Sequence, residues 1–518
     1  MPPAAVSTHT VVVIAAFSLY TLVIVAIGLY AAKFSRDSDE DFFLAGRSLG
    51  SWVAALSASA SSESGWVTLG LVGQGFALGA RAYWIIPGCL LGFLFNWYVI
   101  AGRMSDRARA LDALTLPDFL AFSFGERRPV LRTLAVLIIL VSMLAYVASQ
   151  MAAAGKAFEG AFDINYRLGV LIGAAVVLVY TVSGGFRAVC WTDFLQALLM
   201  VGALVLFPIY LLITHGGLVF VHGQLAEVAG PAAHEPAGYL LDFWPQLGGL
   251  ALVGFLLGAN ALGINFGYPG QPHVLVRFMA LKDRREARIA GAVSFVWGLC
   301  VYWGAVTVGL FARAMFESGE TWAAALKTDQ EMSLVISAMH LLPGVLSGLV
   351  LAAILAAICS TADSQLVVAA SSAANDLYAR IFDRSGRRAH PWVNRLTVLG
   401  LGLLAVLMVV DQRVNVYKYV LTYGWAMLGA AFGPQVLLLL LWKRASYAGC
   451  LAGMLAGFGL AILWPQFYDA GATGVEVYNL PLAFAAALVL NVLVSLMVPG
   501  RGQVAAKAGP GEAPTPDA

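Results

Sequence analysis

The chain has few charged residues and few cysteines. Only 12% of its 518 residues are Asp, Glu, Lys or Arg, about half the share of a soluble domain, whereas 60% are hydrophobic. The five cysteines stand singly in or beside apolar segments and show no metal-ligand spacing, which argues against structural zinc and a disulfide scaffold. This composition excludes a soluble globular domain and predicts an all-α protein that crosses a membrane many times.

The sequence also lacks the motifs of nucleotide-driven and catalytic proteins. It contains no GxxxxGK[ST] phosphate loop and no serine or cysteine nucleophile with a credible histidine partner. A formal net charge of +2 gives no reason to expect a nucleic-acid partner. We therefore expect a protein of the lipid bilayer that is not an enzyme and needs no ATP.

Long apolar runs recur along the whole chain. Thirteen runs of about 18 residues or more cover residues 11–32, 51–78, 82–103, 130–155, 166–183, 192–214, 245–270, 289–314, 344–370, 393–411, 417–442, 447–465 and 478–498. If the N-terminus lies outside, 24 of the 31 lysines and arginines fall in cytoplasmic segments. We predict a multi-pass protein of the plasma membrane with its N-terminus outside and its C-terminus in the cytoplasm.

A polar run interrupts the second apolar segment. Residues Ser57 to Gly65 read SASASSESG, which places five serines and one glutamate inside a stretch long enough to cross a bilayer. Lipid cannot hydrogen-bond a carboxylate or a loosened backbone, and a charge at the centre of a spanning helix costs about 3 kcal/mol. Glu63 is therefore expected to face protein or a water-filled cavity. A position near a helix end, with the carboxylate reaching water, would explain it without a function.

Two later segments carry similar interruptions. In the ninth segment, the polar residues from Cys359 to Gln365 are expected to break the helix. Their hydroxyls and the freed carbonyls are oxygen ligands of the kind that a small hard cation prefers, although such hydroxyls can also bond back to their own helix. In the seventh segment, Gly258 to Pro272 contains four glycines and two prolines, so no helix is expected to run unbroken through it.

The spacing of these interruptions indicates an internal repeat. The second and seventh segments are both broken and lie five segments apart, as expected if two five-helix units of opposite orientation meet around a central site. This interpretation divides the chain into an extra N-terminal span (1–33), a first repeat (51–214), a second repeat (245–442), two C-terminal spans (447–498) and a disordered cytoplasmic tail (501–518).

Several short motifs resemble the sodium:solute symporter family, above all its sodium/proline branch. They are FFLAGRSLG (42–50), LSASASSESGW (56–66), ALTLPDF (113–119), GGFRAVCWTD (184–193), GQPHVLVRFMA (270–280), LAAICSTADSQL (355–366) and GAAFGP (429–434). The resemblance implies the leucine-transporter fold, with one helix before and two after a ten-helix core, and thus thirteen transmembrane helices. It also implies alternating access to a central site, where Na⁺ drives the import of an amino acid or similar small solute. A monomer would suffice for this function.

The resemblance further implies the residues that bind the two ligands. The sodium ligands would be backbone oxygens of Ala60, Glu63 and Ala357 and the hydroxyls of Ser360 and Thr361. Asp193 matches an acidic residue that assists sodium on its way to the cytoplasm, although it could instead cap a helix that starts near Phe194. Substrate contacts would fall on Ser62, Glu63, Ser64, Gly65, Tyr146, Ile264 and Tyr268.

The chain departs from the proline carriers near both sites. Where those proteins have an aspartate, this chain has Ser62, and the acid stands one place later at Glu63, about 100° around a helix. Ile264 replaces a tryptophan of the proline pocket, and Val147 replaces a cysteine after Tyr146. The departures leave open a proton-coupled symporter, in which Glu63 carries the proton or pairs with a cationic amino acid such as lysine.

A third reading, from another class, is a transporter-like sensor or a channel. A sensor would need a signalling domain, and a channel would need a filter-like loop or pore rings, and we expect neither from this sequence. The densest basic cluster is Arg277, Lys282, Arg284, Arg285 and Arg288. We interpret it as a topology anchor against anionic lipid head groups in preference to a regulatory site.

Overall fold

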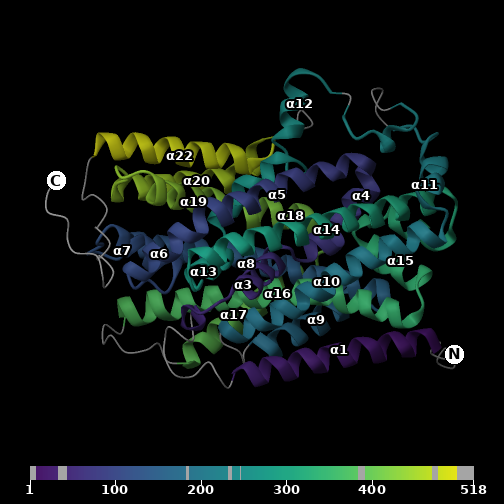
Figure 1. Ribbon diagram of the computed structural model, residues 1–518, viewed down its shortest axis with the longest axis horizontal. Coiled ribbons are helices and arrows are strands. Elements are labelled where there is room, and N and C mark those ends of the chain that lie inside the picture. The colour runs from purple at the N-terminus through teal and green to yellow at the C-terminus, as the bar shows by residue number, and fades with distance from the viewer. Residues whose placement is uncertain are drawn as a thin grey trace.

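The protein is a bundle of long helices. The computed structural model describes residues 8–32, 44–181, 186–230, 236–245, 247–382, 391–468 and 477–498. Within these ranges there is no β-strand, only an isolated bridge between Leu49 and Leu281. Most long helices follow one common axis, and α1 starts at the opposite end of the bundle from the end of α22 (Figure 1). This placement agrees with an odd number of membrane crossings.

The first half of the chain forms fourteen described helical elements, and the polar run from Ser57 to Gly65 lies among them. They are α1 (Thr8–Ala32), η1 (Ala45–Arg47), α3 (Ser51–Ser62), η2 (Trp66–Leu71), α4 (Val72–Leu78), η3 (Gly79–Trp84), α5 (Ile85–Phe95), η4 (Asn96–Ala101), α6 (Gly102–Ala110), α7 (Leu116–Ser123), α8 (Val130–Phe162), α9 (Tyr166–Thr181), α10 (Phe186–Thr214) and α11 (Gly217–Leu225). Local chemistry sets several starts: the Thr115 side chain caps α7 by accepting a hydrogen bond from the Asp118 amide.

The second half contains the other two polar segments. Its elements are η5 (Tyr239–Leu241), α12 (Gly249–Leu256), η6 (Leu262–Gly270), α13 (Pro272–Met279), α14 (Arg284–Glu317), η7 (Thr321–Lys327), η8 (Gln330–Met332), α15 (Ser333–Leu341), α16 (Gly344–Ser371), η9 (Ser372–Phe382), α17 (Pro391–Val409), α18 (Val416–Tyr419), η10 (Val420–Trp425), α19 (Ala426–Leu441), α20 (Tyr447–Phe467) and α22 (Asn479–Met497). Asp283 caps α14 by accepting hydrogen bonds from two amides of its first turn.

All thirteen predicted apolar segments contain helix where the structure describes them. In the described part of the chain, nine helices are long and apolar enough by themselves to cross a membrane, and Thr8–Ile24 and Tyr166–Val179 are shorter apolar helices. One of the nine, Trp66–Ala110, joins the end of the second predicted segment to the third. The count of thirteen therefore stays a prediction. The predicted tail at 501–518 lies outside the described residues.

Two polar helices occupy the centre of the bundle. α16 packs against α1, α8, α10 and α17, and α3 packs against α10, α13, α14 and α16. In Figure 1 both lie between the pair α20 and α22 at one edge and α1 at the other. Because neighbours surround α3 and α16 on several sides, their serines and carboxylates face protein and are buried.

The second and seventh segments are broken, as predicted. α3 ends at Ser62, and the backbone of Glu63 is extended, with φ −102° and ψ 90°, before helix resumes at Trp66. In the seventh segment, α12 ends at Leu256 and a 3-10 stretch follows before α13 starts at Pro272. These interruptions leave backbone groups free to bind ligands within the bundle.

The predicted break in the ninth segment is wrong. α16 runs without interruption from Gly344 to Ser371 and includes all residues from Cys359 to Gln365. The hydroxyls remain compatible with a helix because some bond back to it, as Ser360 does with the Ala357 carbonyl at 3.2 Å. The hydroxyls of α16 are therefore available as ligands on an intact helix.

Candidate ion and substrate site

Four of the five predicted sodium ligands come together where α16 passes the end of α3. The Ser360 hydroxyl donates hydrogen bonds to the Ala60 carbonyl, at 3.0 Å, and to the Ala357 carbonyl, at 3.2 Å. The Thr361 hydroxyl lies 3.3 Å from the same Ala60 carbonyl oxygen. All four residues are fully buried. Two carbonyls and two hydroxyls thus form a compact group of neutral oxygens, which suits a small hard cation.

Glu63, the fifth predicted ligand, is a buried acid at the break in the second segment. Its Oε1 atom accepts hydrogen bonds from Tyr268, at 3.1 Å, and Ser62, at 3.0 Å. Its Oε2 atom has no hydrogen-bond partner within the described residues, and no basic side chain of that part of the chain forms a salt bridge with it. Buried charges are normally paired or bind ions. The Glu63 carboxylate is therefore suited to a cationic ligand.

The carbonyl of Ser62, which the break releases from helical pairing, is held from two sides. Trp66 donates its indole hydrogen to this oxygen at 2.9 Å, and the Tyr146 hydroxyl donates to it at 3.3 Å. The amide of Gly65 donates to the Gln150 side chain at 3.0 Å, and a Cβ at Gly65 would lie 2.7 Å from Ala153. The predicted substrate residues at the end of α3 and directly after it therefore lie close to Tyr146 on α8.

Aromatic rings from distant segments complete this region. The Tyr268 ring lies edge-on to Trp425, at 4.7 Å between centroids, and to Phe93, at 5.1 Å. Trp425 donates its indole hydrogen to the Ile264 carbonyl at 3.0 Å, which fixes the 3-10 stretch of the seventh segment. The Tyr302 hydroxyl lies 3.3 Å from that of Tyr268. The region thus combines the Glu63 carboxylate with a group of packed aromatic rings.

Asp193 lies apart from the sodium oxygens, in a separate buried network. Its Oδ2 atom accepts hydrogen bonds from Ser57, at 2.7 Å, from Ser61, at 3.1 Å, and from Arg277, at 2.8 Å. The Arg277 guanidinium also donates to Ser364 at 2.7 Å. We call these five residues the Asp193 network; it links α3, α10, α13 and α16.

The Asp193 network corrects two sequence interpretations. Asp193 does not cap a helix, because α10 begins at Phe186 and Asp193 lies inside it. Arg277 is not part of a surface anchor, because it is fully buried and forms a salt bridge with Asp193. The sequence could not reveal this pair, since 84 residues separate the partners and no local pattern marks an inward-facing arginine on α13.

Other residues of the site were also missed from the sequence. Gln150, Tyr302 and Trp425 contact predicted site residues, yet each stands in an apolar segment whose sequence shows no polar run like that of the second segment. The only available signal was an amide or aromatic hydroxyl inside a membrane segment, which marks many packing residues as well. Their roles appear only when the broken segments are brought together.

Every predicted site residue is buried, so neither ligand can reach the site without movement. Ion pairs join helices at both ends of the bundle. At one end Lys156 of α8 pairs with Glu331 of η8 at 2.6 Å. At the other, Arg132 of α8 pairs with Asp376 of η9 at 2.6 Å and with Asp118 of α7. Within the described residues, ion pairs thus join the helices on both sides of the buried region.

Comparisons with known proteins identify the family of the chain. The model of the sodium:solute symporter family matches residues 42–457. The chain is 35% identical over 487 residues to the osmoregulated proline transporter OpuE of Bacillus subtilis (strain 168), covering 94% of each chain. It is 36% identical over 477 residues to the sodium/proline symporter of Escherichia coli (strain K12), covering 90% of this chain and 92% of that protein.

A solved structure shows the same fold. A Na⁺-coupled sialic acid symporter in a substrate-bound outward-open state superposes with a TM-score of 0.73, at 17% identity, and covers 95% of this chain and 98% of that chain. This likeness confirms the predicted all-α leucine-transporter fold. The chain therefore belongs to the sodium:solute symporter family, and it is a multi-pass transporter of the plasma membrane and not an enzyme.

Proposed function

We propose that the protein imports proline, or a closely similar small amino acid, together with Na⁺. Na⁺ as the coupling ion agrees with membership of the family, and the comparisons give no support to the proton-coupled alternative. The observation that carries the proposal is the meeting of Ser360 and Thr361 of α16 with the Ala60 carbonyl of α3. Relatives named as proline transporters supply the substrate class.

We assign the sodium site to the oxygens of Ala60, Glu63, Ala357, Ser360 and Thr361. Four of these residues already lie in one hydrogen-bonded group, and Glu63 follows Ala60 by three positions. A bound Na⁺ would take the carbonyl oxygens as ligands, and the two hydroxyls would turn their oxygens toward the ion. We also keep Asp193 on the route that sodium takes to the cytoplasm. Its Oδ1 atom has no hydrogen-bond partner among the described residues, so this oxygen could bind a passing Na⁺.

We place the amino acid beside the Glu63 carboxylate. Its ammonium group would bind Oε2 of Glu63, which would balance a charge that no described basic residue balances. Its apolar part would lie against the rings of Tyr146 and Tyr268, within reach of Ser64, Gly65 and Ile264.

The remaining parts of the proposal concern the internal repeats, the oligomeric state and the orientation of the chain in the membrane. The breaks in the second and seventh segments support two inverted repeats, at 51–214 and 245–442, around the site. All residues that we propose bind the ion or the amino acid belong to one chain and are buried within it, which supports the monomer as the functional unit. The arginine-rich end of the bundle is assigned to the cytoplasm, with the N-terminus outside, by the distribution of basic residues.

The test is uptake into proteoliposomes that contain the purified full chain. Labelled proline is offered with an inward Na⁺ gradient or with a pH gradient alone, and unlabelled amino acids compete. We expect accumulation with Na⁺ and none with the pH gradient alone. The variant Ser360→Ala should lose most Na⁺-driven uptake, because it removes one ligand of the ion.

Ser371→Ala is the matched control for Ser360→Ala. Ser371 is a buried serine of the same helix, and its hydroxyl donates to the Val367 carbonyl, within the helix itself. Its removal should leave uptake unchanged. Accumulation driven by the pH gradient without Na⁺, or equal losses in Ser360→Ala and Ser371→Ala, would contradict the proposal.

A further inference from the structure

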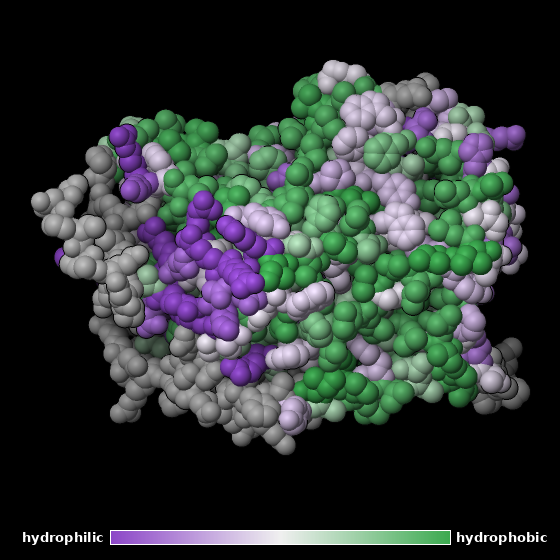
Figure 2. Space-filling view, in the orientation of Figure 1, coloured by the Kyte–Doolittle hydropathy of each residue, from purple (hydrophilic) through white to green (hydrophobic). Residues whose placement is uncertain are grey.

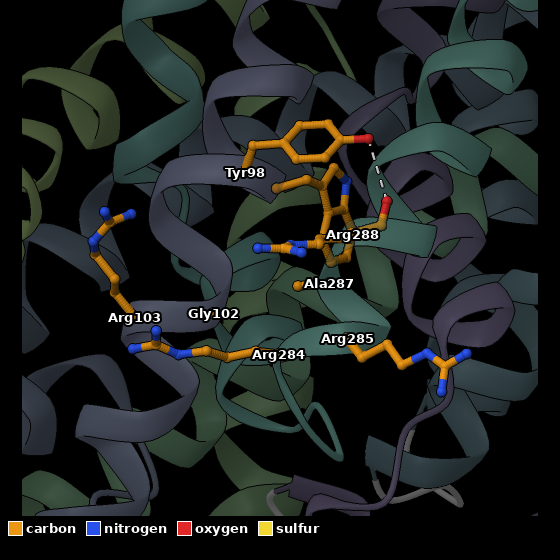
Figure 3. A pocket seen from close by; sticks show the side chains of 8 residues that line it. Tyr98, Gly102, Arg103, Arg284, Arg285, Ala287 and Arg288 are labelled. Carbon is orange, nitrogen blue, oxygen red and sulfur yellow. Dashed lines mark hydrogen bonds between the residues drawn. The ribbon is translucent and has the colours of Figure 1, made fainter.

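A positively charged pocket lies far from the central site, at the arginine-rich end of the bundle. It has a volume of about 420 Å³ and opens between the η4–α6 segment and the first turns of α14. Its lining includes Tyr98, Arg103, Arg284, Arg285 and Arg288. Figure 3 shows the side chains of Arg284 and Arg288 directed toward the side of the pocket where Arg103 lies, whereas Arg285 extends the opposite way.

The charge of this pocket is only partly balanced. Arg284 forms an exposed salt bridge with Asp106, and Arg103 donates a hydrogen bond to the Val99 carbonyl at 2.7 Å. Within the described residues, Arg285 and Arg288 form no salt bridge. Of these four arginines, only Arg284 therefore forms a salt bridge among the described residues. A guanidinium presents donors in a planar fork that matches the oxygens of a phosphate.

The packing of the helix backbones builds the pocket. A Cβ at Gly102 would lie 3.1 Å from the Arg284 side chain, and a Cβ at Gly291 would lie 2.9 Å from the Tyr98 ring. These two glycines let α6 and α14 approach closely, so that side chains of one helix lie across the other. The Tyr98 hydroxyl also donates to the Arg288 carbonyl at 3.3 Å (Figure 3). The arginines are thus held at a defined junction of two helices.

The pocket lies where the outer surface changes from apolar to basic. Along η4 and α5, the exposed residues before the pocket are Leu91, Phe95 and Tyr98, and on α14 those after it are Ile289 and Val296. On both helices the arginines stand at the same end of these apolar faces. Figure 2 shows the corresponding hydrophilic patch over α6, next to the hydrophobic belt of the molecule. Such a position is the boundary between lipid tails and head groups.

We propose that this pocket binds the phosphate of an anionic phospholipid. Arg103, Arg284 and Arg288 hold the phosphate oxygens, and the acyl chains lie along the exposed apolar faces of α5 and α14. A free phosphate would meet the same guanidinium groups but would leave these apolar faces uncovered. Because the ligand bridges α6 and α14, it holds together the two helices at this end of the bundle.

The test measures lipid binding by the delipidated full chain in detergent. Phosphatidylglycerol, phosphatidylcholine and inorganic phosphate are titrated separately, and bound lipid is counted by native mass spectrometry. We expect saturable binding of phosphatidylglycerol alone. The double variant Arg103→Gln/Arg288→Gln should weaken this binding about tenfold or more, because it removes two charge-assisted contacts.

The double variant Arg127→Gln/Arg128→Gln is the matched control, since it removes the same charge from two exposed arginines in the connection between α7 and α8. It should bind phosphatidylglycerol as the unchanged protein does. Equal weakening in both variants, equal binding of phosphatidylcholine, or displacement of the lipid by millimolar phosphate would overturn the proposal. If the pocket double variant fails to fold, the single exposed substitution Arg103→Gln gives the same comparison with a smaller expected loss.

Discussion

Two buried carboxylates that bind serines of α3 have different surroundings. Asp193 and Glu63 are both fully buried, and both accept hydrogen bonds from serines of α3. Asp193 also has a cationic partner, Arg277, at 2.8 Å, whereas Glu63 has none within the described residues. The first acid is thus balanced by the protein itself. The second has no such partner, and this difference is the basis for our proposal that Glu63 binds a cationic ligand whereas the Asp193 network positions the helices.

The Asp193 network lies one helical turn from the proposed sodium oxygens. Ser61, which donates to Asp193, follows Ala60, and Ser364, which accepts from Arg277, stands four residues after Ser360. Residues four apart share one face of a helix. The network therefore links α3 to α16 next to the oxygens that we propose bind the ion, and under this proposal it positions the site.

The largest effect should follow from breaking the ion pair. Asp193→Asn or Arg277→Gln alone leaves the other charge buried without a partner, which typically destabilises a protein by about 3–5 kcal/mol. We expect a marked fall in the thermal unfolding temperature of either single variant in detergent. The double variant Asp193→Asn/Arg277→Gln should lose less than the two single variants together. Additive losses would show that the two charges do not interact.

Glu63 should behave in the opposite way. Glu63→Gln removes a buried charge that has no cation in the described part of the chain, so the unfolding temperature should stay equal or rise. Uptake of labelled proline should fall about 100-fold, which corresponds to about 2.8 kcal/mol of lost ligand stabilisation. The measurement pairs thermal unfolding with uptake for the same preparation. A Glu63→Gln protein that is strongly destabilised, or that transports normally, would remove the contrast with Asp193.

Sodium itself offers a smaller test. A ligand at ten times its Kd stabilises the state that binds it by about 1.4 kcal/mol. We expect Na⁺, compared with K⁺ at equal ionic strength, to raise the unfolding temperature of the unchanged protein. Thr361→Ala should abolish this rise, whereas Ser371→Ala should keep it, because the Thr361 hydroxyl contacts the Ala60 carbonyl and the Ser371 hydroxyl bonds to Val367 of its own helix. An equal rise in both variants would place the ion elsewhere.

The sequence was sufficient for the helices and for the two broken segments. Hydrophobic run length predicts membrane helices because every backbone polar group in lipid must be paired internally. The run SASASSESG and the glycines and prolines between Gly258 and Pro272 mark the breaks for the same reason. In α16, however, serine and threonine were wrong indicators of a break, because their hydroxyls can bond to their own helix.

The partners of the buried charges could not be predicted. Arg277 was interpreted as a surface anchor, since four basic residues follow it within eleven positions. Only the folded structure turns Arg277 inward, while Arg284, Arg285 and Arg288 remain exposed on α14. The difference arises because α13 is covered by α3, α6 and α16, whereas the first turns of α14 are partly open. Such tertiary cover has no signature in a single sequence.

The smallest predicted effect concerns Trp425, which packs against Tyr268, the partner of Glu63. Trp425→Phe keeps the ring against Tyr268 but removes the indole hydrogen that binds the Ile264 carbonyl at 3.0 Å. The loss of one such hydrogen bond costs about 1 kcal/mol, which should raise the apparent KM for the amino acid about fivefold and leave the unfolding temperature nearly unchanged. Trp464→Phe is the control, because its indole binds the Val477 carbonyl away from the site. Equal KM values in the two variants would show that the seventh segment does not need this contact to bind the amino acid.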